Sequence, residues 1–215
     1  MYTGISVFDL DHTLITANSS FRFGAYLYRR GFFPFSVLMR CLSYYMSHKW
    51  LGLSIFDLHH KIFLVLFQGR QSSEIENYVE EFLDQELHTL LYDPVVKRLQ
   101  DAKEKGHYTL ILSASPHFIV RSIASRLNVH SYQSSFYVTD SQGCYKGIDS
   151  IVEGEKKVEC VKHVIKQMGI TASIYAYSDS CLDLPVLKMA EHAIAVKPDR
   201  RLRQISLKNG WEIMS

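Results

Sequence analysis

Short apolar segments alternate with amphipathic helical segments over much of the chain, and this alternation restricts the possible folds more than any other feature. The run at 5–8 predicts a buried strand. Further strands are predicted at 108–112, 174–177 and 193–196, a hairpin at 136–148, and helices at 116–127 and 156–168. Parallel strands need a helical crossover between them, so the pattern is typical of an α/β fold with a doubly wound parallel sheet.

The segment 18–91 interrupts this alternation, because its pattern is helical throughout. Three breaks divide it into about four helices, near 31–34, 52–54 and 69–72. In the last of these helices apolar residues recur at helical spacing, and Ser73 with Glu76 predicts a capping box at its start. We therefore expect an inserted helical module, with 1–17 and 92–215 forming the α/β core.

Charge and aromatic side chains are distributed unevenly. The whole chain is nearly balanced, with 24 Lys and Arg against 22 Asp and Glu, which argues against a nucleic-acid binder. Residues 15–70 carry seven basic side chains and one acid, Asp57, whereas 71–92 carry six acids and no Lys or Arg. Of the 27 aromatic residues, 13 lie between Phe21 and Phe67. The average composition therefore hides an unusual segment.

This segment allows two interpretations. In the first, its aromatic side chains fill the core of the helical module, and opposite charges face each other on neighbouring helices. In the second, they form an aromatic, basic surface that contacts an anionic membrane or a lipid phosphate. A membrane-spanning helix is not predicted, because charged residues and Pro34 interrupt the apolar stretches.

The cysteines and the first residues favour a cytoplasmic protein. None of the four cysteines forms a CxxC pair or has zinc-ligand spacing, which is typical of free thiols in a reducing compartment. The N-terminal residues lack the basic and apolar regions of a secretory signal. No GxGxxG motif follows the first strand, which argues against a dinucleotide-binding domain.

Polar residues stand where three of the predicted strands end. Asp9 and Asp11 follow the first strand, Ser113 follows the second, and Ser178 and Asp179 follow the strand at 174–177. In a doubly wound sheet such ends lie at one edge, where ligands bind. Two carboxylates held close together repel unless a cation lies between them, and oxygen ligands suit Mg²⁺. Taken singly, each pattern is also compatible with an Asx turn or a helix N-cap.

Taken in order, the motifs resemble the haloacid dehalogenase superfamily, most closely its phosphoserine-phosphatase-like subfamily IB. The segments that carry the resemblance are 8–14, 112–116, 177–185 and 195–199, together with Lys157. They span both ends of the chain. The resemblance implies a Rossmann-like doubly wound core with an α-helical cap inserted after the first strand, and it assigns 18–91 to that cap.

The resemblance also implies a role for each motif residue. Asp9 would be the nucleophile, and Asp11 the general acid and base. Mg²⁺ would be held by Asp9, by the backbone carbonyl of Asp11 and by Asp179. Asp183 would orient Lys157 or a metal-bound water. The residues expected to contact the substrate are Thr13, Asn18, Ser113, Ala114 and Lys157, with Lys156 as the alternative to Lys157.

The implied activity is that of a Mg²⁺-dependent phosphomonoester hydrolase, which acts on a small phosphate ester through an aspartyl-phosphate. A phospholipid head-group phosphatase, a phosphotransferase with the same nucleophile and a non-catalytic phosphate-binding protein are the alternatives. His12 takes a position that is often glycine in this family. The segment 16–20 lacks the acid that would bind the amine of phosphoserine, which argues against that substrate. The oligomeric state stays open.

Overall fold

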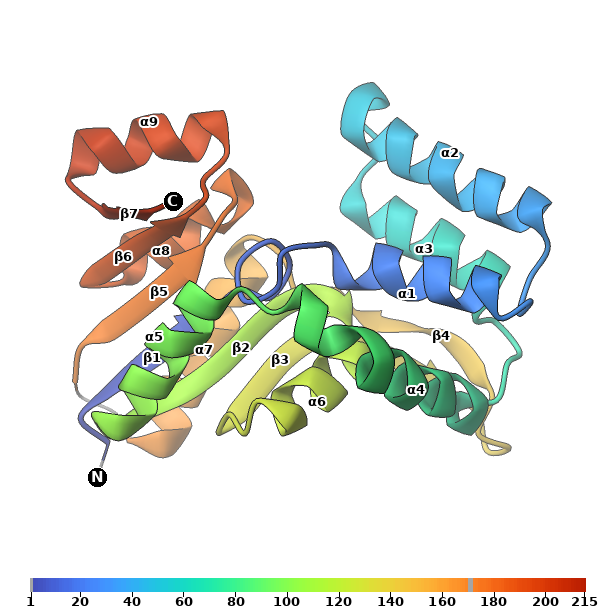
Figure 1. Ribbon diagram of the computed structural model, residues 1–215, viewed down its shortest axis with the longest axis horizontal. Helices are drawn as coiled ribbons and strands as arrows, with labels where there is room; N and C mark the ends of the chain where they lie inside the picture. Colours follow the sequence, from blue (N-terminus) through green and yellow to red (C-terminus); the bar gives the residue numbers. More distant parts are fainter. Residues whose placement is uncertain (1, 170–171) are drawn as a thin grey trace.

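The computed structural model describes residues 2–169 and 172–215, which form a seven-stranded sheet flanked by helices (Figure 1). The strand order is β4-β3-β2-β1-β5-β6-β7. Every neighbouring pair is parallel except β3 and β4, which form an antiparallel hairpin. The strands are β1 (Gly4–Phe8), β2 (His107–Pro116), β3 (Ser131–Thr139), β4 (Tyr145–Ser150), β5 (Ile174–Ser178), β6 (His192–Val196) and β7 (Glu212–Met214).

Helices cover both faces of the sheet. The apolar side chains of α5 (Asp93–Glu104) and α6 (His117–Arg126) pack on one face, against Phe8 and Ile111. Those of α7 (Glu155–Met168), α8 (Leu184–Met189) and α9 (Arg200–Asn209) pack on the other face. The chain moves outward from β1 to β2 and β3, and later returns to β5 on the other side of β1. The predicted doubly wound α/β fold is confirmed, and the carboxyl ends of β1, β2 and β5 meet at its switch point.

Four helices fill the interval between β1 and α5. They are α1 (Ser19–Arg29), α2 (Phe35–Leu51), α3 (Ile55–Leu66) and α4 (Ser72–Leu90). Their apolar core is continuous with that of the sheet, since Phe23 and Phe67 contact the fully buried Phe118 of α6 with ring centroids 6.3 and 5.4 Å apart. The helical segment thus shares a core with the α/β layers, and the boundaries at 18 and 91 stay a prediction.

Ion pairs connect α4 to both of its neighbours. Arginines of α1 and α6 face the acids of α4, which lies beside α6 in Figure 1. The pairs are Arg22–Glu86, Arg29–Glu86, Arg30–Glu81, Arg121–Glu76, Arg126–Glu80 and Arg126–Asp84. The interpretation of opposite charges on facing helices is therefore right for α1 and α4. This interpretation does not account for the other basic residues of the helical segment, which are Arg40, Lys49, Lys61 and Arg70.

One predicted helix cap was wrong, and two strands were missed in part or in whole, each because of a tertiary pairing. No capping box forms at Ser73, since the N-cap of α4 is Gln71, two residues earlier, which pairs with Cys144 of the hairpin turn. The strand β3 begins at Ser131, ahead of the predicted hairpin, because it also pairs with β2. The short strand β7 was not predicted, because it is only three residues long and forms by pairing with β6.

Two histidines make the stability of this core depend on pH. Burial lowers the pKa of His59 and of His117 to about 4. Both contact Tyr137, and the Nδ1 atom of His117 accepts its backbone N–H at 3.2 Å. In the unfolded chain each histidine binds a proton near pH 6.5. The contribution of the neutral, buried histidines to the free energy of unfolding is therefore complete above that pH and is lost as the pH falls towards 4. We expect the free energy of unfolding to drop by about 2 kcal/mol per histidine between pH 7 and 4.5.

Urea unfolding of the wild type and of His117→Gln at both pH values checks this expectation. Glutamine keeps an acceptor for the backbone N–H of Tyr137 but does not titrate, so the variant should lose less stability on acidification. Comparing the two proteins cancels the carboxyl groups, which titrate in both. An equal loss in both proteins would show that His117 does not contribute.

Candidate active site

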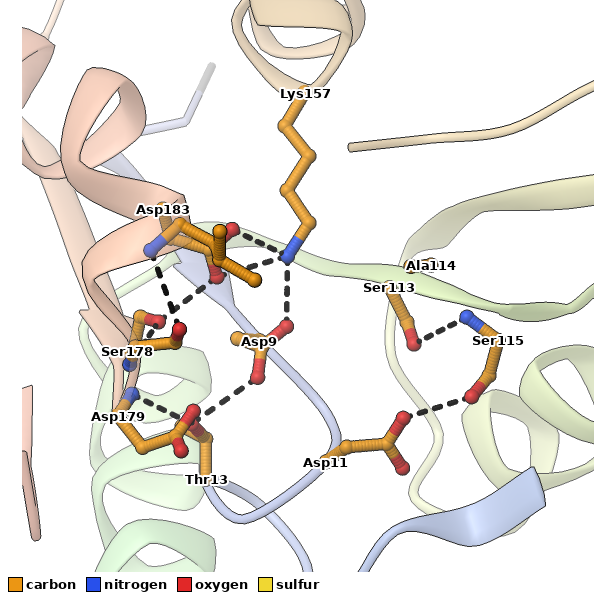
Figure 2. Close-up of polar contacts among 12 residues, drawn as sticks. Asp9, Asp11, Thr13, Ser113, Ala114, Ser115, Lys157, Ser178, Asp179 and Asp183 are labelled. Atoms are coloured by element: carbon orange, nitrogen blue, oxygen red, sulfur yellow. Dashed lines mark hydrogen bonds and ion pairs between the residues drawn. The ribbon is translucent and has the colours of Figure 1, made fainter. Parts of the chain in front are cut away.

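Asp9 and Asp11 lie in the turn that follows β1 (Figure 2). The backbone N–H of Asp9 donates to the carbonyl of Tyr177 at 2.9 Å, which extends the pairing with β5 by one residue and fixes the start of the turn. The side chain of Asp9 is buried, whereas that of Asp11 is partly exposed. The two carboxylates therefore stand in different surroundings although only Leu10 separates them.

A buried lysine from α7 reaches Asp9. The Lys157 Nζ atom lies 2.8 Å from Asp9 Oδ1 and 2.8 Å from Asp183 Oδ2, and only 4% of the residue is exposed. The neighbouring Lys156 is exposed and pairs with Glu159 on its own helix. Of the two lysines that the sequence offered, the structure thus places Lys157 in the carboxylate cluster.

The cluster holds more negative than positive charge. Burial raises the pKa of Asp9 well above its usual value, and the Lys157 ammonium opposes that rise. Burial also raises the pKa of Asp179 to about 6. For Lys157 burial alone would lower the pKa, but Asp183 and Asp9 together raise it. One ammonium thus faces three carboxyl groups, which favours a further cation or proton at this edge.

The carboxylates of Asp9 and Asp179 converge on one hydroxyl. Thr13 Oγ1 lies 3.2 Å from Asp9 Oδ2 and 3.4 Å from Asp179 Oδ1, and it accepts the backbone N–H of Asp179 at 3.1 Å. Oxygen donors with excess negative charge suit Mg²⁺. Within 2–169 and 172–215 no group of three His, Cys, Asp or Glu side chains has metal-binding spacing. The predicted set needs only two side chains, because its third donor is the backbone carbonyl of Asp11, so the residues present fit the ion.

Asp11 is held from the opposite side of the site. Its Oδ1 atom accepts the backbone N–H of Ser19, the first residue of α1, at 2.6 Å. Its Oδ2 atom accepts the hydroxyl of Ser115 at 2.7 Å (Figure 2). Asp11 therefore links the start of the helical segment to the end of β2. Because both oxygens accept hydrogen bonds, they are held in a fixed orientation.

Two serines of the site were not predicted as site residues. The sequence pattern was compatible with a helix cap at Ser115, but α6 begins only at His117. The hydroxyl of Ser115 donates to Asp11 instead. The Ser178 hydroxyl donates to Asp183 Oδ2 at 2.8 Å and so helps to hold the partner of Lys157. Both lie inside motif segments that carry the family resemblance, Ser115 in 112–116 and Ser178 in 177–185. That position was the available signal.

The other residues that were predicted to contact the substrate lie in different parts of the site. Thr13 is fully buried and its hydroxyl serves Asp9 and Asp179, so it orients these carboxylates. Asn18 caps α1, because its Oδ1 atom accepts the N–H of Phe21 at 2.8 Å. Ser113 is buried within β2, three residues before the strand ends, and accepts the N–H of Ser115, with Ala114 between them. Direct contact of these residues with a substrate stays a prediction.

A cavity of about 300 Å³ lies elsewhere, between α5 and the strands β5 to β7. Its lining includes Arg98, Tyr175 and His192, and none of the predicted site residues. We assign it no part in the reaction. None of the helices in the described chain combines the length and apolar character needed to cross a membrane.

Comparison with known proteins decides the family. The model of the haloacid dehalogenase-like hydrolase family matches residues 6–188, which include Asp9, Lys157 and Asp183. The chain belongs to the haloacid dehalogenase-like hydrolase family. Among curated relatives of this hydrolase, a phosphoserine phosphatase of Mycobacterium tuberculosis is 27% identical over 98% of this chain and 70% of its own. A histidinol-phosphatase of Neisseria meningitidis is 24% identical over 98% of both chains.

Solved structures show the same fold for this hydrolase. A protein of unknown function from Bordetella pertussis has a TM-score of 0.91 at 23% identity and covers 100% of this chain and 99% of its own. A substrate-bound phosphoserine phosphatase has a TM-score of 0.71 at 14% identity, over 95% of this chain and 90% of its own. The family match and the phosphatase relatives confirm the prediction of a phosphatase of the haloacid dehalogenase type.

The backbone at His12 has a conformation that glycine adopts more readily than histidine. His12 has a φ of +59°, in the left-handed region that glycine adopts without steric cost. A side chain there costs about 1 kcal/mol. His12 is exposed and interacts electrostatically with Asp179, since it opposes the rise in the pKa of that carboxyl. The position therefore tolerates a histidine next to the acidic cluster.

Proposed function

We propose that this phosphatase is a phosphomonoesterase in which Asp9 attacks phosphorus and Asp11 moves the protons. The observation that carries the proposal is the Asp9–Lys157–Asp183 cluster, with Nζ–O distances of 2.8 Å, beside a differently held Asp11. The ammonium of Lys157 opposes the rise in the pKa of Asp9 that burial causes, and so favours the ionised, nucleophilic carboxylate. Asp11, which has partners of its own and does not contact Lys157, is the second carboxyl group, and we assign it the role of acid and base.

The reaction has two chemical steps. An oxygen of Asp9 bonds to phosphorus, the ester P–O bond breaks, and the departing alkoxide takes a proton from Asp11. Asp11, now a carboxylate, takes a proton from water, whose oxygen bonds to phosphorus as the bond to Asp9 breaks. Inorganic phosphate leaves, and both carboxyl groups return to their starting states.

Other residues hold the phosphate and the nucleophile. We assign to the Lys157 ammonium the neutralisation of a phosphate oxygen, and to Ser113 and the backbone at Ala114 hydrogen bonds to the other oxygens. Asp183, supported by Ser178, fixes the position of Lys157. Mg²⁺ would be held by Asp9, Asp179 and the backbone carbonyl of Asp11, and it would offset the repulsion between carboxylate and phosphate.

Removing the metal should abolish most of the activity. We expect EDTA to lower phosphate release by at least about 100-fold, because the carboxylate excess then opposes phosphate binding. Added MgCl₂ should restore the rate, and Asp179→Asn should need more Mg²⁺ for half-maximal activity. A protein that keeps its full rate in EDTA would contradict the assigned metal role.

The substrate we propose is a small phosphate ester. Relatives named for phosphoserine and histidinol phosphate support this class. Asn18 presents an amide rather than a carboxylate, so we expect phosphoserine to be a poor substrate. A phosphate-release panel with Mg²⁺ tests the proposal, and it should contain phosphoserine, histidinol phosphate, sugar phosphates and phosphatidylglycerophosphate. No release from any ester would overturn it, and product analysis with an added alcohol separates hydrolysis from phosphoryl transfer.

We also place the reaction in the cytoplasm. Four free thiols support this compartment, since disulfides are rare in reducing surroundings. They belong to Cys41, Cys144, Cys160 and Cys181. Burial raises the pKa of Cys41 and of Cys160, which keeps these thiols protonated and unreactive.

A further inference from the structure

The helix α2 is more exposed to solvent than its many apolar residues would predict. Eleven of its 17 residues are apolar or aromatic, yet none of its residues is buried. The apolar face of a helix is normally covered by other elements. Of the eleven large apolar side chains that are exposed in the described chain, seven belong to α1, α2 and α3. They are Phe21, Phe35, Met39, Trp50, Leu51, Phe56 and Leu64, with exposed fractions of 46–80%.

The apolar side chains of α2 form one stripe flanked by basic residues. Phe35, Met39, Met46 and Trp50 follow one another at intervals of four, seven and four residues, which places them on one face of the helix. Arg40 and Lys49 project on the two sides of this stripe, since each is separated from its centre by roughly a quarter turn or more. The helix contains no Asp or Glu.

The basic charge of this region is not neutralised within the described chain. The arginines of α1 pair with α4, but Arg40, Lys49 and Lys61 have no carboxylate within ion-pair distance in the described residues. The Lys61 ammonium lies over the ring of Tyr44, 5.3 Å from its centroid, and so adds its charge to α2. Asp57 is the sole acid between residues 31 and 70. The region therefore presents apolar and positive groups together.

This region adjoins the catalytic edge. The C-terminal end of α2 and the first turns of α1 and α3 lie on the same side of the helical segment (Figure 1). Phe21 contacts Tyr45 of α2 with ring centroids 6.2 Å apart, and Ser19, two residues before it, binds Asp11. His48 of α2 is close enough to Glu153, just before α7, to counteract part of the rise in pKa that burial causes there. Through Tyr45, α2 thus packs on the same first turn of α1 whose Ser19 binds Asp11.

We propose that this α2 surface, formed by Phe35, Met39, Trp50, Leu51 and Phe56 with Arg40, Lys49 and Lys61, docks on an anionic phospholipid bilayer. Aromatic and aliphatic side chains enter the interface, while the long basic side chains reach the head groups. A second copy of the chain fits less well, because a two-fold contact would bring the basic residues of α2 together without any acid on the helix. The proposal does not depend on the proposed reaction.

Sedimentation with lipid vesicles tests the docking. We expect the full chain to co-sediment at low salt with vesicles of phosphatidylcholine and phosphatidylglycerol, and to stay in solution with phosphatidylcholine alone. Each basic residue near an anionic surface contributes about fivefold in affinity, so the triple change Arg40→Gln, Lys49→Gln and Lys61→Gln should weaken binding by about 100-fold. Trp50→Ser with Phe56→Ser should weaken it as well, because less apolar surface is buried.

Matched controls lie on α9. The triple change Arg201→Gln, Arg203→Gln and Lys208→Gln removes the same charge from exposed positions, and Leu207→Ser removes an exposed apolar side chain. Both should bind vesicles like the wild type. In a Trp211→Phe background Trp50 is the only tryptophan, and its emission should shift to shorter wavelength with anionic vesicles.

Three results would overturn the docking proposal. They are absence of binding at low salt, equal loss in the α2 and α9 triple variants, and a dimer that Trp50→Ser converts to a monomer without any vesicle binding. Hydrolysis of a soluble ester, measured in parallel, reports on the reaction alone. A failure of either proposal is thereby distinguishable from a failure of the other.

Discussion

Asp9→Asn should abolish phosphate release while the protein stays folded. Asparagine preserves the shape of the side chain, but its neutral amide does not attack phosphorus as a carboxylate does. Loss of a nucleophile that works with other groups lowers kcat by about 10⁴-fold or more. Phosphate release with Mg²⁺ from the best ester of the panel measures the loss.

Stability separates this loss of reaction from a loss of fold. Asp183 still pairs with Lys157 in the variant, and one of the crowded carboxylates is gone. We therefore expect the midpoint of thermal unfolding to equal or exceed that of the wild type. Asp149→Asn is the matched control, because Asp149 is an exposed residue of β4 outside the site. Near-normal turnover by Asp9→Asn would exclude Asp9 as the nucleophile.

Lys157→Met should damage both reaction and fold. The change leaves the carboxylates of Asp9 and Asp183 buried without the ammonium that lies 2.8 Å or less from each. Removing one partner of a buried ion pair costs about 3–5 kcal/mol of folding free energy. Loss of a fixed charge at the transferring phosphate lowers kcat by about 10³-fold. Urea unfolding and phosphate release measure the two effects.

Lys156→Met provides the comparison at the adjacent position. Lys156 is on the same turn of α7, but its ammonium is exposed and pairs only with the exposed Glu159. Exposed pairs contribute about 0–1 kcal/mol, so this variant should keep its stability and its rate. If the two variants behaved alike, the central position of Lys157 would be wrong.

The fold was predictable because its strands and helices carry local signals. Apolar runs of four or five residues that end in polar residues predicted β1, β2 and β5, and helical spacing predicted α4, α6 and α7. The predictions that failed concern segments whose pairing partner is distant in the sequence. The start of α4 at Ser72 depends on the hairpin turn near Cys144, and β7 depends on β6. No local pattern encodes such pairings.

The candidate site shows the same division. Asp9, Asp11 and Asp179 were identified because they follow strands, and the order of motifs connected them. The hydroxyl of Ser115 was overlooked as a partner of Asp11, since its binding depends on contacts between residues 104 positions apart. The local pattern around Ser115 and Pro116 predicted a cap, whereas the strand continues to Pro116.

The helical segment illustrates the limit of composition. Its charges and aromatic residues were visible in the sequence, but the interpretation of facing charges and a filled core applies only to some of its helices, and membrane contact stays a proposal. The arginines of α1 face acids on α4, and Phe23 and Phe67 fill a shared core. In contrast, α2 keeps its apolar stripe and its basic residues on the outside.

By itself, the sequence determined the α/β alternation, the acidic and hydroxyl residues at the strand ends and the uneven charge of the helical segment. Only the tertiary structure decided that Lys157 rather than Lys156 enters the carboxylate cluster, which serines hold Asp11 and Asp183, and which apolar side chains stay outside. The physical reason is that strand and helix propensities act within a few residues, whereas burial and charge pairing depend on which distant segments pack together.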